Sequence, residues 1–138
     1  MTSTSLIESD YESKAIRITW NPEGEFIQVE WKGYATDVEY LEILAKQLAL
    51  TKQKKANRIL YDLRKMGMVS ADNQNYTNEV YFPQMAQAGS KRAAIVVPES
   101  IFGEASVNSI LGKKNEALFE AELFKDTDSA RQWLTRTA

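Results

Sequence analysis

The sequence contains no cysteine and no histidine. The lack of cysteine excludes disulfides, thiolate catalysis and cysteine metal sites. The lack of histidine removes the commonest general base and the commonest metal ligand of proteins. An enzyme built from this chain would have to use carboxylate, lysine, tyrosine or serine side chains. We therefore expect a protein that is not an enzyme and that has no metal and no cofactor.

The chain also lacks a dominant charge and a long apolar run. Its 17 Lys and Arg residues against 19 Asp and Glu residues give a net charge of −2, whereas nucleic-acid-binding proteins usually carry a strong basic excess. No segment approaches the roughly 20 apolar residues that span a bilayer. The first residues do not show the basic and then apolar pattern of a secretory signal. We expect no nucleic-acid partner, no transmembrane segment and a cytoplasmic location.

The composition that is present is that of a globular protein. The chain has 138 residues, of which 43% are hydrophobic and 26% are charged. A chain of this length buries roughly 68% of the surface that its unfolded form exposes, which is enough for a core without disulfides. We expect residues 1–138 to form a single domain.

Alternating apolar residues predict two strands in the first third of the chain. In Ala15–Trp20 and in Phe26–Trp31 apolar and polar residues alternate, and Asn21–Gly24 between them holds a proline and a glycine. This pattern is typical of an antiparallel hairpin with one packed face and one face in water. Leu6–Glu12 is a candidate for a further, weaker strand.

Strands and helices alternate through the rest of the chain. Compact apolar segments predict strands at Arg58–Leu63, Ala93–Val97 and Leu118–Phe124. Capping residues and helical periodicity predict helices from the capping box Thr36–Glu39 to about Lys54, over Asp72–Ala88 with a kink or break at Pro83, over Phe102–Leu111, and after Asp126 and Thr127. The predicted fold class is α/β, with an N-terminal β-hairpin followed by α-β-α-β-α-β-α and a mixed, mostly parallel sheet with helices packed on it.

The first long helix carries apolar residues on two faces. One stripe, expected to pack on the sheet, consists of Val38, Leu41, Leu44, Ala45 and Leu48. Ile43 and Leu50 fall on the opposite face, so they predict a homodimer face or a second packed layer. The alternative is that they are scattered surface residues, which need no explanation.

The segment Ile59–Asp72 is the predicted working edge, because ligands of open α/β sheets bind where strands end. The candidate contact residues are Asp62, Arg64, Met66, Met68, Ser70, Asp72 and Tyr76. Each also has a structural interpretation. Asp62 could pair with Arg64 or Lys65, the methionines could pack in the core rather than form an adaptable apolar surface, and Ser70 could cap a helix rather than bind an anion.

A basic cluster is predicted at the other end of the sheet, formed by Lys52, Lys54, Lys55, Arg58, Lys91 and Arg92. Such a cluster fits an anionic or membrane surface, or it stabilises helix C-termini.

Three local patterns resemble the STAS superfamily, the sulfate-transporter and anti-sigma-factor-antagonist domains. They are the strand ending Leu60-Tyr61-Asp62-Leu63, the strand Ala93–Pro98 after Lys91-Arg92, and the tail with Leu123-Phe124-Lys125-Asp126 and then Ser129–Leu134. The resemblance is closer still to a bacterial branch with a STAS-like or CRAL-TRIO-like, lipid-binding fold. In anti-sigma-factor antagonists the corresponding loop reads Asp-Ser-Ser/Thr-Gly and is phosphorylated.

The resemblance implies a non-enzymatic regulatory or protein-interaction module that contacts its partner through the loop after Leu63. The alternative it implies is a binder or sensor of a small apolar ligand such as a lipid. Here the loop reads Val69-Ser70-Ala71-Asp72, which leaves Ser70 as the possible phosphoacceptor. A phosphate on Ser70 would lie beside Asp72 and be repelled by it.

Overall fold

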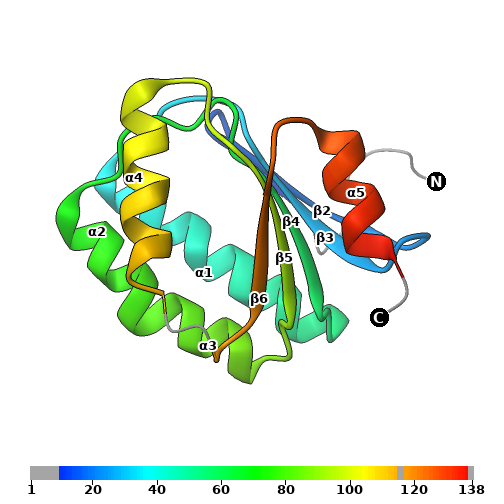
Figure 1. Ribbon diagram of the computed structural model, residues 1–138. Coiled ribbons are helices and arrows are strands. Elements are labelled where there is room, and N and C mark those ends of the chain that lie inside the picture. The colour runs from blue at the N-terminus through cyan, green and yellow to red at the C-terminus, as the bar shows by residue number, and fades with distance from the viewer. Residues whose placement is uncertain (1–9, 115–116, 137–138) are drawn as a thin grey trace.

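The computed structural model describes residues 10–114 and 117–136. Within them, six strands form one sheet in the order of the chain (Figure 1). The strands are β1 Tyr11–Glu12, β2 Ile16–Asn21, β3 Phe26–Trp31, β4 Arg58–Asp62, β5 Arg92–Val96 and β6 Glu120–Phe124. The helices are α1 Asp37–Lys54, α2 Ala71–Tyr76, the π-helical turn η1 Thr77–Tyr81, α3 Phe82–Gln87, α4 Ile101–Gly112 and α5 Thr127–Thr135.

The first three strands are antiparallel and include the predicted hairpin. Strands β2 and β3 pair from Ile16 opposite Trp31 to Asn21 opposite Phe26. The Asn21 side chain closes the turn by accepting the Gly24 N–H at 2.8 Å. Of the weaker strand predicted over Leu6–Glu12, the described part forms β1, and residues 6–9 lie outside the described residues.

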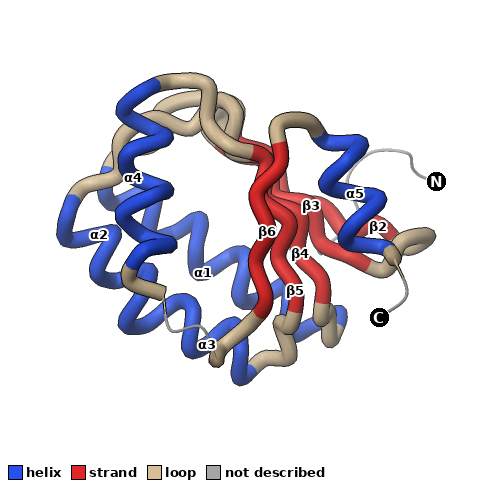
Figure 2. The backbone as a smooth tube through the Cα atoms, viewed as in Figure 1, coloured by secondary structure: helices blue, strands red, loops and turns tan. Residues whose placement is uncertain are grey.

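Strands β4, β5 and β6 are each parallel to the strand before them. Each crossover advances by one strand in the same direction, and crossovers of this kind share one hand. They therefore place α1, the segment α2–α3 and α4 on the same face of the sheet, whereas α5 covers the other face (Figure 2). The predicted α/β architecture, with its hairpin and mostly parallel sheet, is confirmed.

The sheet separates two apolar cores. The larger lies between the sheet and α1–α4, and the smaller lies under α5, where Ala130 and Leu134 are fully buried. Adjacent residues of β4 face opposite cores: Ile59 packs in the larger and Leu60 in the smaller. A strand covered on both faces shows an apolar run without alternation, as the sequence of β4 does.

The predicted outer face of α1 is wrong. Ile43 and Leu50 are only 2% and 3% exposed and belong to the larger core, so they form no dimer face. The buried side of α1 also contains Gln47 and Thr51, whose polar side chains are satisfied by hydrogen bonds. Because these two residues are polar, the apolar pattern of the buried side is interrupted in the sequence. Val38, which belongs to the predicted stripe, is exposed.

The predicted break near Pro83 takes the form of a π-helical turn. Proline has no N–H to donate within a helix, and its ring crowds the carbonyl four residues earlier. In η1 the bonding changes to a five-residue step, since the Phe82 N–H donates to the Thr77 carbonyl. The helical segment therefore continues through Pro83 into α3, with the wider turn immediately before it.

Candidate functional site

The loops that follow β3, β4 and β5 meet at one edge of the sheet, where the parallel strands end. A groove of about 400 Å³ is bordered by residues of all three loops, among them Tyr34, Gly67 and Ser100. The Glu99 N–H donates to the Arg64 carbonyl at 3.0 Å, which joins the loop after β5 to the loop after β4. We call this part of the molecule the C-terminal edge.

Asp62 and Arg64 form an ion pair at the end of β4. Arg64 donates from Nε and Nη2 to the two Asp62 carboxylate oxygens, at 2.9 and 2.7 Å, and its backbone N–H reaches the same carboxylate. The Asp62 side chain is buried, whereas that of Arg64 is 41% exposed. The hydrogen bonds that Arg64 donates to Asp62, and then the negative charge of Asp62, raise the pKa of Arg64. Both residues shape the loop through this pair.

The loop after β4 is fixed to α4 by a bond and by a close approach. The Val69 N–H donates to Ser106 Oγ at 2.9 Å. A Cβ atom on Gly103 would lie 2.3 Å from the Met66 carbonyl oxygen, so only glycine lets the helix come this near. Neither contact is visible in the sequence, because each joins residues more than thirty positions apart.

Ser70 and Asp72 begin α2, as predicted for capping residues. Ser70 Oγ accepts the Asn73 N–H at 3.2 Å, and Asp72 is exposed in the first turn. The Asn73 side chain donates to the Asp37 carbonyl at 3.1 Å, which ties the start of α2 to the start of α1. Ser70 therefore has a structural bond in place.

The two methionines of the loop point to different environments. Met66 is 6% exposed and borders a cavity in the larger core, whereas Met68 is 68% exposed. Tyr76, on the last turn of α2, is partly exposed and does not border the cavity. Of the predicted contact residues, Met68 is thus available to a partner and Met66 to a molecule inside the core.

The cavity, of about 70 Å³, lies between the sheet and the helices of the larger core. Its walls are mostly apolar and aromatic, and Phe82 meets Phe119 edge to face with ring centroids 5.0 Å apart. The lining residues include Trp31, Leu44, Tyr61, Leu63, Val107 and Ile110. The cavity lies beneath the loop that begins at Leu63.

Three tyrosine hydroxyls in this cavity are bonded to protein partners. The hydroxyls of Tyr61 and Tyr81 are 2.8 Å apart, and Tyr81 also donates to Gln47 Oε1. The hydroxyl of Tyr40 lies 2.7 Å from that of Thr77. Burial raises the pKa of Tyr40 to about 12 and also raises the pKa of Tyr61 and of Tyr81. The hydroxyls are therefore neutral structural groups at ordinary pH.

Sequence reasoning missed most of the exposed apolar residues at the C-terminal edge. Within the described residues, all but one of the exposed large apolar side chains lie on the segments that leave β3, β4 and β5. They are Tyr34, Val38, Leu41, Met68, Tyr76, Ile101 and Phe102. The available signal was a pair of apolar residues directly after the helix-capping Ser100, where the first turn faces outward.

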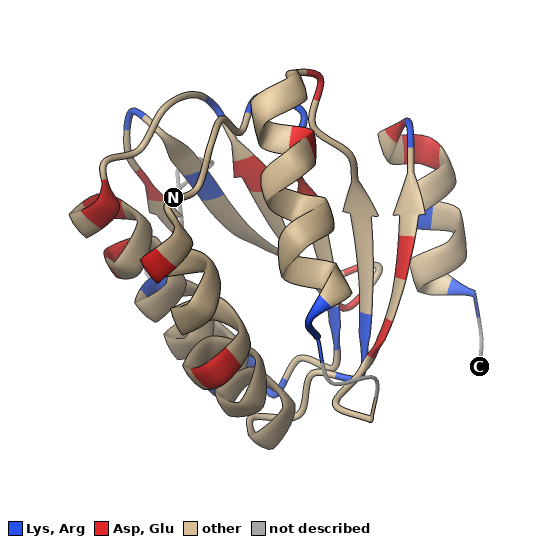
Figure 3. Ribbon diagram, turned by 60° about the vertical axis from the view of Figure 1, so that its left-hand side comes forward, with Lys and Arg blue, Asp and Glu red and all other residues tan. Residues whose placement is uncertain are grey.

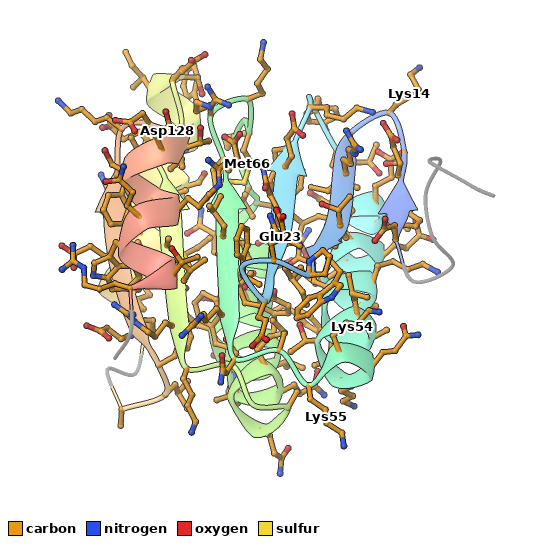
Figure 4. All side chains as sticks on the ribbon, turned by 90° about the vertical axis from the view of Figure 1, so that its right-hand side faces the viewer. Lys14, Glu23, Lys54, Lys55, Met66 and Asp128 are labelled. Carbon is orange, nitrogen blue, oxygen red and sulfur yellow. The ribbon has the colours of Figure 1, made fainter. Side chains whose placement is uncertain are left out.

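The predicted basic residues lie at the opposite end of the sheet. Figure 4 shows Lys54 and Lys55 at the end away from Met66. Lys54 lies 5.9 Å from the Trp20 ring centroid, and Arg92 lies 4.0 Å from that of Trp133 and 3.4 Å from a Glu120 carboxylate oxygen. These partners account for part of the cluster, while Lys52, Lys55 and Lys91 are exposed.

Among the described residues, no group of three or more Asp or Glu side chains is arranged to hold a metal ion. In the same part of the chain, no helix has the length and apolar character that crossing a membrane requires.

A family model for SpoIIAA-like proteins matches residues 26–135. The chain belongs to the SpoIIAA-like family. This confirms the resemblance to the STAS superfamily that the strand endings and the C-terminal tail predicted. SpoIIAA-like domains are in general regulatory and interaction modules rather than enzymes, and STAS domains typically act on protein partners. The match begins at β3 and includes the whole C-terminal edge. No curated protein matches the chain.

Proposed function

We propose that this SpoIIAA-like protein is a regulatory module that binds a protein partner through the C-terminal edge. The observation that carries the proposal is the exposure of Met68, on the loop after β4, and of Ile101 and Phe102, in the first turn of α4, which are 68%, 80% and 69% exposed. Single exposed apolar residues are ordinary, but a group of them on one surface is typical of an interaction site.

The surface is also held in a defined shape. The hydrogen bond from Val69 to Ser106 joins the loop before α2 to the middle of α4, and the bond from Asn73 to Asp37 joins the start of α2 to the start of α1. A surface that is ordered before binding loses less conformational freedom when the partner arrives. This supports recognition by fixed side chains.

The test is affinity capture from an extract of the native host, with mass spectrometry of the captured proteins. The double variant Met68→Asp with Ile101→Asp places two charges in the contact and should lose the specific partner. A matched control, Asn57→Asp with Gln132→Asp, adds the same charge at exposed positions of other surfaces and should retain it. Capture of the same proteins by both variants would contradict the proposal.

A second candidate function is binding of a small apolar ligand in the cavity beneath the loop. The specific observation is the apolar wall, in which the hydroxyls of Tyr40, Tyr61 and Tyr81 already have partners. At about 70 Å³ the cavity is smaller than the ~150 Å³ engineered cavity that holds benzene. A ligand of lipid size would therefore require the helices to move away from the sheet.

Native mass spectrometry of the freshly purified protein tests this candidate. A bound mass that disappears in Val107→Trp, which fills the cavity wall, would support it. A ligand-free mass, together with no stabilisation of the protein by benzene or similar hydrocarbons, would contradict it.

A further inference from the structure

The exposed apolar side chains at the C-terminal edge lie on segments of the chain that carry charge of one sign. Residues 33–45, 66–90 and 93–112, which include the first half of α1, the segment α2–α3 and all of α4, contain seven Asp and Glu residues and no Lys or Arg. All seven carboxylates are exposed: Asp37, Glu39, Glu42, Asp72, Glu79, Glu99 and Glu104. Figure 3 shows acidic positions on the helices that cover one face of the sheet. We call this the acidic apolar surface.

Two of the basic residues near this surface are neutralised by ion pairs. Lys32 lies 2.6 Å from a Glu12 carboxylate oxygen, and Arg64 is paired with the buried Asp62. Lys65 is a third cation that borders the groove, and Lys46, on α1 directly after residue 45, is exposed. The exposed lysines Lys52, Lys55, Lys91 and Lys113 instead lie where α1 and α4 end and where β4 and β5 begin. The end of the molecule where β4 and β5 begin is therefore rich in lysine.

The helix dipole explains some of these carboxylates but not the whole surface. Asp37, Asp72 and Glu104 lie in first turns, where negative charge is favourable. Glu42 and Glu79 lie beyond the first turns of α1 and α2. The dipole also gives no reason for the exposure of Ile101 and Phe102 in the first turn of α4. Apolar side chains surrounded by charge of one sign are complementary to an apolar segment that carries the opposite charge.

From this complementarity we infer that the partner docks through a cationic amphipathic segment, meaning apolar side chains flanked by Lys and Arg. The inference rests on the proposed function and specifies the chemistry of the partner. The apolar side chains of the segment would cover Met68, Ile101 and Phe102, and its cations would face the surrounding carboxylates. Such pairs at a rim contribute mainly to the association rate and to selectivity.

Two other occupants fit the surface less well. An anionic membrane is negatively charged and attracts basic segments. The seven exposed carboxylates would therefore repel it. A second copy of the chain could present its basic end, but no exposed large apolar side chain of the described residues lies at that end to cover Ile101 and Phe102. A cationic amphipathic segment satisfies both the charge and the apolar side chains.

The test is selection of peptides from a random displayed library on the native protein. Enriched peptides should carry a net positive charge together with apolar residues. Their affinity should fall with added salt, because exposed charges are screened. Replacing the four carboxylates together, with Glu42→Gln, Asp72→Asn, Glu79→Gln and Glu104→Gln, should weaken binding of an enriched peptide about tenfold, a difference of about 1.4 kcal/mol.

A matched control removes four carboxylates elsewhere, with Glu23→Gln, Glu25→Gln, Glu122→Gln and Asp128→Asn, all at exposed positions. It should bind the same peptide within about twofold, a difference of roughly 0.4 kcal/mol. An equal loss in both variants would show that only the net charge matters and would overturn the inference. Enrichment of neutral or acidic peptides would also overturn it.

The variant Ile101→Ser with Phe102→Ser separates failure of the inference from failure of the proposed function. If the enriched peptides carry no positive charge and lose binding in this variant, the C-terminal edge remains the partner site and only the inference of a cationic segment is overturned. If the peptides bind this variant with unchanged affinity, both the proposed partner site and the inference of a cationic segment are overturned. Binding to phosphatidylserine vesicles, or a dimer in sedimentation, that is lost in the same variant would assign the surface to a lipid or to a second copy, and so overturn the inference.

Discussion

At the scale of single residues, the larger core depends on buried polar groups that satisfy one another. Gln47, Tyr61 and Tyr81 form one connected group, and Tyr40 pairs with Thr77 in another. A buried hydroxyl or amide without a partner costs about 1–3 kcal/mol, so these groups specify one arrangement of α1 against η1 and the sheet. They also explain why the sequence misled the assignment of the faces of α1. Gln47 appears polar, yet it is buried because Tyr81 supplies its partner.

The buried tyrosines predict a loss of stability at alkaline pH. Burial raises the pKa of Tyr40 from 10.0 to about 12 in the folded protein. The unfolded chain therefore releases this proton first, and the free energy of unfolding, complete below pH 10, decreases as the pH rises towards 12. Urea unfolding across this range should show the decrease, and Tyr40→Phe should make it shallower. The exposed Tyr34 provides the control, because Tyr34→Phe should leave the slope unchanged.

At the scale of elements, the position of α4 relative to the loop after β4 sets the C-terminal edge. Local patterns were enough to predict that α4 and this loop exist. Their contact depends on Gly103 lying against the Met66 carbonyl and on Ser106 accepting from Val69. No periodicity reports such a contact, since it is made only after the strands have brought distant segments together. The capping role of Ser70 could be predicted because it depends on residues next to it in the sequence. The different directions of Met66 and Met68 could not be predicted, because they depend on contacts with distant segments.

Gly103→Ala should therefore disturb the C-terminal edge. The added Cβ would lie 2.3 Å from the Met66 carbonyl oxygen and 2.9 Å from Pro98 Cβ. Relief requires a shift of backbone, so we expect a loss of about 1–3 kcal/mol in the free energy of unfolding, measured with urea. Gly112→Ala, at the other end of the same helix, has no atom within 4 Å of the new Cβ. It should be neutral or stabilising by up to about 1 kcal/mol, and an equal loss in both variants would contradict the assigned contact.

At the scale of the whole molecule, the fold was predictable because its signals are local and repeated. Alternation in β2 and β3, the capping box at Thr36 and the apolar segments of β4 and β5 each determine one element, and the rules for crossovers then determine their order. The acidic apolar surface was not predicted, because it gathers Tyr34, Met68 and Phe102 from three segments that lie far apart in the sequence. Its charge is nevertheless present in the sequence as stretches without Lys or Arg. Because the fold brings these stretches to one face, their composition indicates the charge expected of the partner.

The two cores share the strands β4 and β5, so damage to the smaller core should weaken the whole fold. Leu134, on α5, is fully buried in the core that contains Leu60 and Val96. Leu134→Ala should lower the free energy of unfolding by about 2–5 kcal/mol, through lost burial and the cavity left behind. Because Ile59 and Leu60 alternate between the two cores, urea transitions followed by tryptophan fluorescence and by circular dichroism should shift together. Leu123→Ala, at a side chain that is 47% exposed, should change the free energy much less, by about 0.5 kcal/mol. A fluorescence transition at lower urea than the circular dichroism transition in Leu134→Ala would show instead that α5 detaches while the larger core stays folded.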